Sequence, residues 1–530
     1  MPKRRRLLSL LCVLSLCGCP APLTPATLPP PGDGLGEHWL SFVQISDTQL
    51  VDEESPARAA KMDGLIAASW RPQETYGVAT LDATIAVINA RHAARKAAGH
   101  GIDCLVVTGD LCDLAQYNEL RWFIDTMDGK VVDTDSGGID GNSRTDDPAD
   151  NTKLPIDTVG LDPEIPWYSI VGNHDVLAVG NFPVDVSSNS PVFYSAPLLP
   201  PVAALIGLHD IAWNLNAMLP VSGKSPAVIT GLGPKIDGET LQLKTGKLHA
   251  GKLEADTARR FLTLEDFIDE HFNTTSAPLG HGFAEVKQAE YPACYSFRPK
   301  AEAPVRFIVL DTVPPKAPKG YPAFYGVVTR EMFENFLKPE VDAAKAAGEF
   351  VVVLSHHPSA DFDLPFPARK VGSSEFREFL AAQPNVLAHL CGHSHINRVH
   401  EVPGANPYLE IETGAIIDYP QEARHFDIFF DAATETVTLA AQMFGHLDAP
   451  TRLSQESYRR CYIDALQGQS DQKPPEEKYQ ALFTDATKSW GLGDAVPREK
   501  TAVSADERRG THADRNGVWQ LKRRAPLAWR

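Results

Sequence analysis

Short apolar stretches that each end in a metal-type side chain dominate the hydrophobic pattern of the chain. Residues 104–107, Cys-Leu-Val-Val, are followed by Thr-Gly, by Asp110 and, three residues later, by Asp113. A short run rich in β-branched residues is typical of a strand buried on both faces, and the glycine lets the backbone turn at the strand's carboxyl end. Open α/β sheets bind ligands at that end. Asp110 by itself is not evidence of a ligand site, because an Asp in this position often caps a following helix.

Four further segments share this arrangement of an apolar run followed by Asp, Asn, Gln or His. They are residues 39–46 before Asp47 and Gln49, residues 170–172 before Asn173 and His174, residues 351–355 before His356, and residues 390–392 before His393 and His395. The carboxyl ends of parallel strands meet at one edge of a sheet, so we expect these side chains to lie close together.

The remaining periodicity predicts a β-α-β start and a second group of strands. Helices are predicted over residues 81–98, 254–272 and 330–347, and a further buried strand over residues 306–311. After His395 the pattern changes to alternating strands over residues 408–412, 425–430 and 436–443. We interpret these three strands as a second sheet that packs on the first.

Composition divides the chain into unequal parts. With 530 residues, 43% of them hydrophobic, the chain is long enough to bury a large core. We expect a leader over residues 1–19, a Pro-rich tether over 20–37, a domain over 38–446 with insertions near 125–165 and 176–291, and a C-terminal extension over 447–530. The insertions either cover a substrate or decorate the surface. The extension carries no chemistry that the pattern predicts.

The leader indicates export. Basic residues 3–6 precede the apolar run 7–16, which is too short to span a bilayer. The run ends in Leu-Cys-Gly-Cys, which resembles the bacterial lipobox and predicts a lipid anchor at Cys19. An ordinary cleaved signal peptide is the alternative. We therefore expect an exported protein of the cell envelope that contacts the membrane through this anchor, with the inner and outer membranes both open.

The net charge limits which partners the protein can bind, and the cysteine positions bear on whether it forms disulfides. The formal charge of −18 argues against a nucleic-acid backbone as the main partner, although a local metal site still attracts phosphate. Beyond the leader, five scattered cysteines remain at positions 104, 112, 294, 391 and 461. An odd, dispersed set is not a disulfide framework, although it leaves room for one disulfide.

The side chains at the strand ends suit a metal centre. Carboxylates, imidazoles and amide oxygens bind borderline divalent metals such as Mn, Fe or Zn, and no thiolate cluster selects Zn alone. Two metals about 3.5–4 Å apart share a bridging ligand and lower the pKa of bound water towards about 7. A hydroxide that bridges them is then available as a nucleophile at neutral pH.

The ordered motifs resemble those of the calcineurin-like metallophosphoesterase superfamily. They are Asp47-x-Gln49, Gly109-Asp110-x-x-Asp113, Gly172-Asn173-His174-Asp175, His356 and Gly392-His393-x-His395. The motifs extend over most of the chain. The resemblance implies an α/β fold with four layers, in which two mixed sheets are flanked by helices. It also implies a centre of two metal ions at the strand ends.

The resemblance also implies a role for each motif residue. Asp110 would bridge the two metals. Asp47, Gln49 and His395 would complete the coordination of one metal, and Asn173, His356 and His393 would complete that of the other. His174 would donate a proton to the leaving alkoxide, with Asp113 holding its ring. This agrees with the general need of a catalytic acid for a second group that fixes its tautomer.

Position 49 departs from the usual pattern of the superfamily, which has His there. A Gln offers only a neutral amide oxygen, a weaker donor than imidazole for these metals. Some branches of the superfamily resemble this chain in having Gln, so loss of activity does not follow. Our hypothesis from the sequence is that Gln49 is a metal ligand.

Several neighbouring residues have more than one interpretation. His357 either contacts substrate or packs, and His389 is expected to be a hydrogen-bonded buried histidine. Asp175 either caps a turn or acts in the chemistry. Arg424 is either a phosphate clamp or part of an ion pair.

The favoured function is that of a metal-dependent phosphoester hydrolase, acting on phosphomonoesters or phosphodiesters. The alternative is a lipoprotein that keeps the fold and binds metal or phosphate with reduced catalysis, for which Gln49 is the main argument. The presence of both Asp113 and His174, which are useful only for turnover, favours the enzyme.

Overall fold

The computed structural model describes most of the chain beyond the leader. It covers residues 34–52, 71–136, 154–180, 257–313, 325–363, 370–467 and 503–523, with short strands between 182 and 247. The predicted leader, most of the tether, residues 137–153 of the first insertion and more than half of the second insertion lie outside the described residues. Among the described residues, none of the helices combines the length and the apolar character needed to cross a bilayer.

The first sheet has six strands in the order β21-β20-β19-β1-β2-β5. Their bounds are β1 (Glu37–Ile45), β2 (Cys104–Val107), β5 (Trp167–Ser169), β19 (Glu422–Asp431), β20 (Thr436–Gly445) and β21 (Asn516–Lys522). Strands β1, β2 and β5 are parallel, whereas β19, β20 and β21 continue the sheet antiparallel. The C-terminal extension thus supplies the edge strand of this sheet.

The second sheet also has six strands, in the order β11-β12-β14-β16-β18-β17. Their bounds are β11 (Tyr295–Phe297), β12 (Val305–Leu310), β14 (Phe350–Ser355), β16 (Val386–Cys391), β17 (Arg398–Val402) and β18 (Tyr408–Glu412). The four central strands are parallel and the two edge strands are antiparallel. The carboxyl ends of the central strands therefore share one edge.

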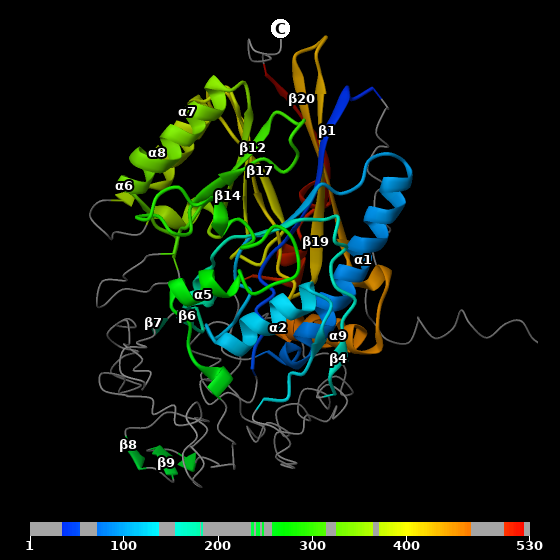
Figure 1. The fold of residues 1–530 in the computed structure, drawn as a ribbon, viewed down its shortest axis with the longest axis vertical. Coiled ribbons are helices and arrows are strands. Elements are labelled where there is room, and N and C mark those ends of the chain that lie inside the picture. The colour runs from blue at the N-terminus through cyan, green and yellow to red at the C-terminus, as the bar shows by residue number, and fades with distance from the viewer. Residues whose placement is uncertain are drawn as a thin grey trace, which may run out of the picture.

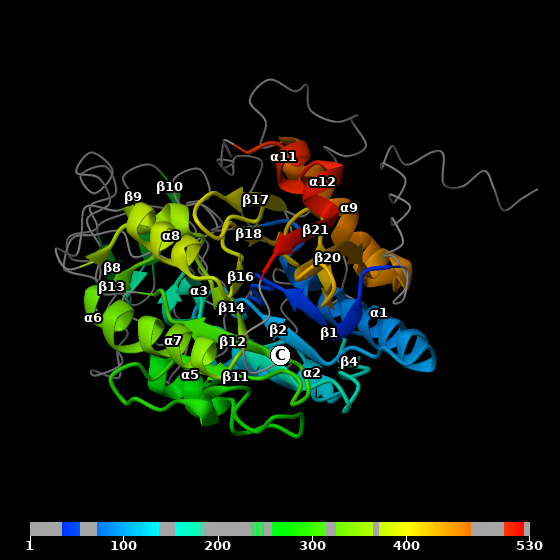
Figure 2. The ribbon, with the colours of Figure 1, turned by 90° about the horizontal axis from the view of Figure 1, so that it is seen from above.

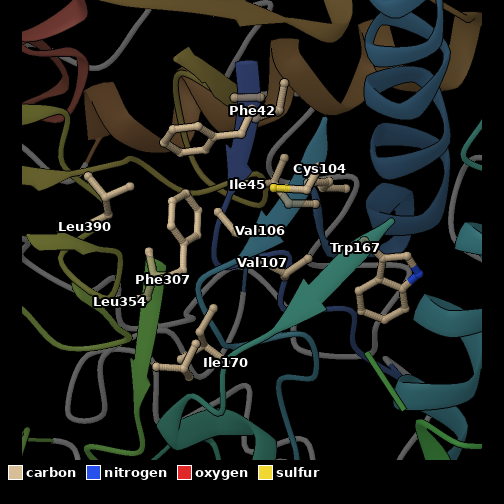
Figure 3. Close-up of a cluster of buried hydrophobic side chains, with 14 of the residues drawn as sticks. Phe42, Ile45, Cys104, Val106, Val107, Trp167, Ile170, Phe307, Leu354 and Leu390 are labelled. Carbon is tan, nitrogen blue, oxygen red and sulfur yellow. The ribbon is translucent and has the colours of Figure 1, made fainter. Parts of the chain in front are cut away.

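The main hydrophobic core lies between the two sheets. In β12, Phe307 and Val309 join this core, while Ile308 points to the opposite face and the helices behind it. The ring of Phe42 in β1 stacks on the ring of Phe426, and it contacts Phe307 of the other sheet in an edge-to-face arrangement. Figure 3 shows Phe42 and Phe307 facing each other across this layer. The central strands β2, β14 and β16 are buried on both faces, because apolar residues fill nearly every position along them.

Helices cover the outer face of each sheet. On the second sheet these are α6 (Arg330–Met332), α7 (Lys338–Ala346) and α8 (Ser373–Ala382), with one π-helical segment, Phe333–Leu337, joining the first two. On the first sheet, α1 (Gly77–Ala97) and α2 (Tyr117–Met127) contribute to the core, and α9 (Arg452–Gln467) packs beside α1. Figure 1 and Figure 2 show these two helical groups on opposite sides of the sheets. The predicted four-layer α/β fold is confirmed.

Smaller elements connect the layers. The short helices are α3 (Asn173–Val176), α5 (Leu264–Glu270), α11 (Ala505–Arg509) and α12 (His512–Arg515), with 3-10 turns at Glu74–Tyr76, Thr257–Arg259, Phe283–Glu285, Ser359–Asp363 and His446–Asp448. The short strands are β3 (Val131–Val132), β4 (Ile156–Asp157), β6 (Leu177–Ala178), β7 (Phe182–Pro183), β8 (Lys235–Asp237), β9 (Thr240–Leu243), β10 (Gly246–Lys247), β13 (Val328–Thr329) and β15 (Lys370–Val371).

Two expectations about individual elements were wrong. The three strands after His395 do not form one second sheet, because β18 joins the sheet of β14 and β16 whereas β19 and β20 join that of β1. The helix predicted over 254–272 is broken among the described residues into the turn Thr257–Arg259 and helix α5. The break is stabilised by Thr263, whose hydroxyl accepts a hydrogen bond from the backbone N–H of Asp266 and so caps α5.

The five cysteines beyond the leader are all free and buried. The disulfide for which the sequence left room is therefore absent among these five residues. Burial raises the pKa of Cys104 and of Cys391 well above the ordinary thiol value, so both side chains act as small apolar groups in their strands.

A buried ion pair fixes the second sheet against α8. Glu410 of β18 accepts hydrogen bonds from His389, as the sequence led us to expect for that histidine, from Ser359 and from Arg377. Burial raises the pKa of Glu410, but these partners outweigh burial and bring the pKa to about 2. The folded state therefore binds a proton at Glu410 more weakly than the unfolded chain does.

We predict that Glu410→Gln lowers the free energy of unfolding at pH 7 by about 3 kcal/mol, the value that corresponds to the depressed pKa. A depressed carboxyl pKa stabilises the fold above the unfolded pKa near 4.5, and this stabilisation is lost as the pH falls through 2. Urea unfolding at several pH values measures the difference, which should shrink between these limits. The exposed Glu378→Gln on α8 is the control, and equal effects of both variants would contradict the prediction.

Candidate metal centre

The five predicted strand ends meet at one edge of the two sheets. Asp47 and Gln49 follow β1, Asp110 follows β2, Asn173 follows β5, His356 follows β14, and His393 and His395 follow β16. Backbone hydrogen bonds join the neighbouring ends, from Asp47 N–H to Gly109 O at 3.1 Å and from Gln49 N–H to Asp110 O at 2.9 Å. All of these residues except the half-buried His393 are buried.

The backbone is strained at most of these positions. Asp47, Gln49, Asp110, His393 and His395 all have positive φ, between 39° and 65°. The left-handed region costs a residue with a Cβ roughly 1–2 kcal/mol. Strain of this kind persists where the surrounding structure enforces it, and it concentrates at functional sites. The turns aim the side chains away from the strand directions and towards one another.

One group of acceptor atoms converges beside His356. Its Nδ1 donates to Thr108 O at 2.7 Å, so its Nε2 faces Asp110 Oδ2 at 3.2 Å and Asn173 Oδ1 at 3.0 Å. The Asn173 amide nitrogen donates to Gly180 O at 2.9 Å, which leaves its oxygen facing inward. His393 Nδ1 lies 3.1 Å from the same oxygen. A proton on His356 Nε2, or a metal ion among these atoms, offsets the repulsion between their lone pairs.

A second group forms around Asp47 and His395. His395 Nδ1 donates to Asp418 Oδ2 at 2.8 Å, so its Nε2 faces Asp47 Oδ1 at 3.2 Å. The acceptor atoms of Asp47, Asp110 and His356 all lie within 4.8 Å of one another. Asp110 therefore stands between the two groups. An outward donor that fixes the inward lone pair is the usual support of a metal-binding histidine.

The electrostatics of this edge favour bound positive charge. Burial lowers the pKa of His356, but the charges of Asp110 and Asp47 outweigh it and raise the pKa to about 10. For His395, Asp47 and Asp418 likewise outweigh burial and raise the pKa to about 9. A proton on either inward nitrogen competes with a metal ion for the same lone pair. The donor set of carboxylate, imidazole and amide oxygens thus fits divalent metals.

Gln49 is oriented differently from the other predicted ligands. Its amide nitrogen donates to Asp110 Oδ2 at 3.0 Å, and its amide oxygen accepts from the Arg71 guanidinium at 2.5 Å. The hypothesis that Gln49 binds a metal stays a prediction from the sequence. The contacts of its amide favour a different role.

His174 lies against Asp113 and contacts both its backbone carbonyl and its carboxylate. His174 Nδ1 donates to Asp113 O at 2.9 Å and lies 3.3 Å from Asp113 Oδ1. Its Nε2 is then directed at Asp110 Oδ2, 4.0 Å away. Burial lowers the pKa of His174, but the charges of Asp110 and Asp113 outweigh it and raise the pKa above its ordinary value. The ring can therefore carry a proton at Nε2 near neutral pH.

Asp175 holds the turn that carries Asp110. Its two carboxylate oxygens accept the backbone N–H groups of Asp110, Leu111, Cys112 and Gly172 at 2.7–3.0 Å. Asp175 thus caps turns that precede it in the chain, not the following turn that the sequence suggested. Gly109 has φ +91°, and a Cβ there would lie 2.6 Å from His356 Nδ1, which explains why the turn begins with glycine.

Three charged residues around the centre were missed by the sequence analysis. Arg71 lies 3.2 Å from Asp113 and 3.1 Å from Asp418, and Arg508 of the C-terminal extension donates to Asp418 at 3.1 Å. Burial raises the pKa of Asp418, but the two arginines outweigh it and hold the pKa well below its usual range. No periodicity or motif links these positions to the strand ends.

The structure also places two residues for which the sequence left two interpretations open. His357 lies beside the centre with its ring 4.4 Å from that of His393, and Thr312 Oγ1 lies 2.8 Å from its Nδ1. It is fully buried, as most of the candidate ligands are, and its ring and those of His356 and His393 each offer a nitrogen within 4.8 Å of the others, so both interpretations stand. Arg424 is not placed as a phosphate clamp, because it is buried and its guanidinium donates to Thr413 Oγ1 and to the carbonyls of Glu412 and Asp514. Burial lowers its pKa to about 9.

Comparisons with known proteins add little to this geometry. No protein-family model matches the chain. No curated protein matches it either. A crystal structure of a dimetal phosphatase from Danio rerio is similar at 12% sequence identity and a TM-score of 0.33, over 77% of this chain and 97% of that chain. Similarity at this level supports no conclusion about function.

We predict that Asp175→Ala lowers the free energy of unfolding by at least about 3 kcal/mol, because it leaves several buried N–H groups without their acceptor. Urea unfolding measures the loss. Asp266→Ala is the matched control, since this exposed carboxylate accepts the N–H of Thr263 at the start of α5, and its loss should cost only about 1 kcal/mol. Similar losses in both variants would show that the Asp110 turn does not depend on Asp175.

Proposed function

We propose that the chain is a metal-dependent phosphoester hydrolase with two divalent ions of Mn, Fe or Zn. The convergence of inward lone pairs on Asp110 is the observation that carries the proposal. Asp47 and His395 would hold one ion, Asn173, His356 and His393 the other, and Asp110 both. Bound divalent ions would polarise the phosphoryl oxygens and lower the pKa of water at the site.

In this proposal His174 donates the proton that the leaving alkoxide needs. Its Nδ1 is tied to Asp113, and its Nε2 is directed at the same carboxylate oxygen of Asp110 that the metal ligands approach. The negative charges around the ring favour the protonated form that an acid requires. The substrate would be a phosphomonoester or phosphodiester, small or linked to a lipid.

We predict that the purified protein, loaded with Mn, Fe or Zn, hydrolyses phosphate mono- or diesters. His174→Ala should lower kcat by about 10²–10⁴ on alkyl esters, whose leaving groups need a proton, and by much less on aryl esters. Asp110→Asn should abolish both activity and metal binding. The exposed His512→Ala is the control and should match the wild type.

Two results would contradict this prediction. Absence of hydrolysis with all three metals would favour the alternative of a metal- or phosphate-binding protein with the same fold. An unchanged rate of His174→Ala on alkyl esters would remove the residue from its role as the acid.

We also propose, from the leader alone, that the protein is exported and anchored in the cell envelope by a lipid on Cys19. The apolar run that ends in Cys17-Gly18-Cys19 supports this proposal. The envelope would then be the compartment in which the enzyme meets its phosphoester.

We predict that bacterial cells expressing the full chain incorporate labelled palmitate into the protein and that Cys19→Ser abolishes the label. Cys17→Ser is the matched control because it lies two residues away and should leave the label intact. Equal labelling of both variants would rule out Cys19 as the anchor.

A further inference from the structure

The predicted ligands fall into two groups by the direction of their hydrogen-bond donors. His356, His395 and Asn173 each tie a donor to an acceptor outside the centre, at Thr108, Asp418 and Gly180, and so turn a lone pair inward. Gln49 does the reverse. Its amide oxygen is held outside by Arg71, and its N–H faces Asp110.

Chemistry fixes this orientation of the Gln49 amide. A guanidinium has only donors, and the Asp110 carboxylate oxygen that faces the amide at 3.0 Å is an acceptor. Turning the amide over would place its nitrogen against Arg71 and its oxygen against the carboxylate, so both hydrogen bonds would become repulsive contacts. Asn173, the other amide at the centre, has a carbonyl as its outer partner and therefore presents oxygen.

Arg71 cannot easily move to release the amide. Its NH1 lies 3.2 Å from Asp113 Oδ1, its Nε lies 3.1 Å from Asp418 Oδ1, and its backbone N–H donates to Glu74. The guanidinium is planar and buried, so its contacts with Asp113, Asp418 and Gln49 fix its place. Each of the two carboxylates also supports a residue of the centre, since Asp113 holds His174 and Asp418 holds His395.

We infer that Gln49 is a positioning residue that orients the bridging carboxylate of Asp110, and that Arg71 imposes this role by holding the amide oxygen outside the centre. The inference rests on the proposed two-metal function. Without Gln49, the metal-binding position formed by Asp47 and His395 has one protein ligand fewer than the motif implies. This metal-binding position is then the weaker of the two, and it fills second as the metal concentration rises.

The test is a calorimetric Mn²⁺ titration of metal-stripped protein, with metal content measured by elemental analysis. The wild type should bind two ions with unequal affinities. His395→Ala, which removes a proposed ligand of the weaker position, should weaken that position at least a hundredfold. Gln49→Ala removes only a hydrogen bond to Asp110, so it should weaken the same position by less than about a hundredfold, the upper end for groups that act through a ligand.

The role of Arg71 is tested by comparing the single variant Arg71→Met with the double variant that carries Arg71→Met and Gln49→Ala. Without the guanidinium the Gln49 amide is free to turn its oxygen inward. Adding Gln49→Ala to Arg71→Met should therefore lower the Mn²⁺ affinity by a factor at least ten times larger than adding it to the wild type. If Arg71→Met does not fold, the comparison of Gln49→Ala with His395→Ala still decides the role of Gln49.

The outcomes separate this inference from the proposed function. A loss of a hundredfold or more in Gln49→Ala, as large as that expected for His395→Ala, with two ions in the wild type, overturns the positioning role and identifies Gln49 as a ligand. An equal effect of Gln49→Ala in both backgrounds overturns the role of Arg71. A wild type that binds fewer than two ions overturns the two-metal function itself, and this inference with it.

Discussion

The crowding of lone pairs at one edge of the sheets is the constraint on which the other features of the centre depend. His356 Nε2 lies 3.2 Å from Asp110 Oδ2 and 3.0 Å from Asn173 Oδ1, and the acceptor atoms of Asp47, Asp110 and His356 lie within 4.8 Å of one another, an arrangement that a cation among them stabilises. The fold meets this constraint in three ways. It ties the outward nitrogens of the ligands to fixed acceptors, it enforces left-handed turns at five residues, and it places Arg71 and Arg508 beside the supporting carboxylates.

The sequence predicted those parts of the fold that depend on local pattern. Apolar runs of strand length marked β1, β2, β14 and β16, and the polar residues that follow them came together because parallel strands end at a common edge. Sheet membership could not be predicted in the same way. The alternation of β18 resembles that of β19, and which sheet each joins depends on packing between distant segments.

The parts of the centre that the sequence did not predict are those that act through another residue. Asp418 and Arg508 reach His395 from segments with no motif, and Arg71 reaches Gln49 from beyond the predicted elements. The sequence identified the Gln at position 49 but not the direction of its amide. That direction depends on whether the outer partner is a carbonyl, as for Asn173, or a guanidinium, as for Gln49.

The contribution of residues 503–523 has a consequence for biosynthesis. Strand β21 pairs with β20 at the edge of the first sheet, and Arg508 reaches the carboxylate that holds His395. Synthesis proceeds from the N-terminus, so β1 and Asp47 leave the ribosome long before these partners exist. The centre therefore acquires its full support only after residues 503–523 have been synthesised, and a nascent chain that stops before them lacks the Arg508 contact to Asp418.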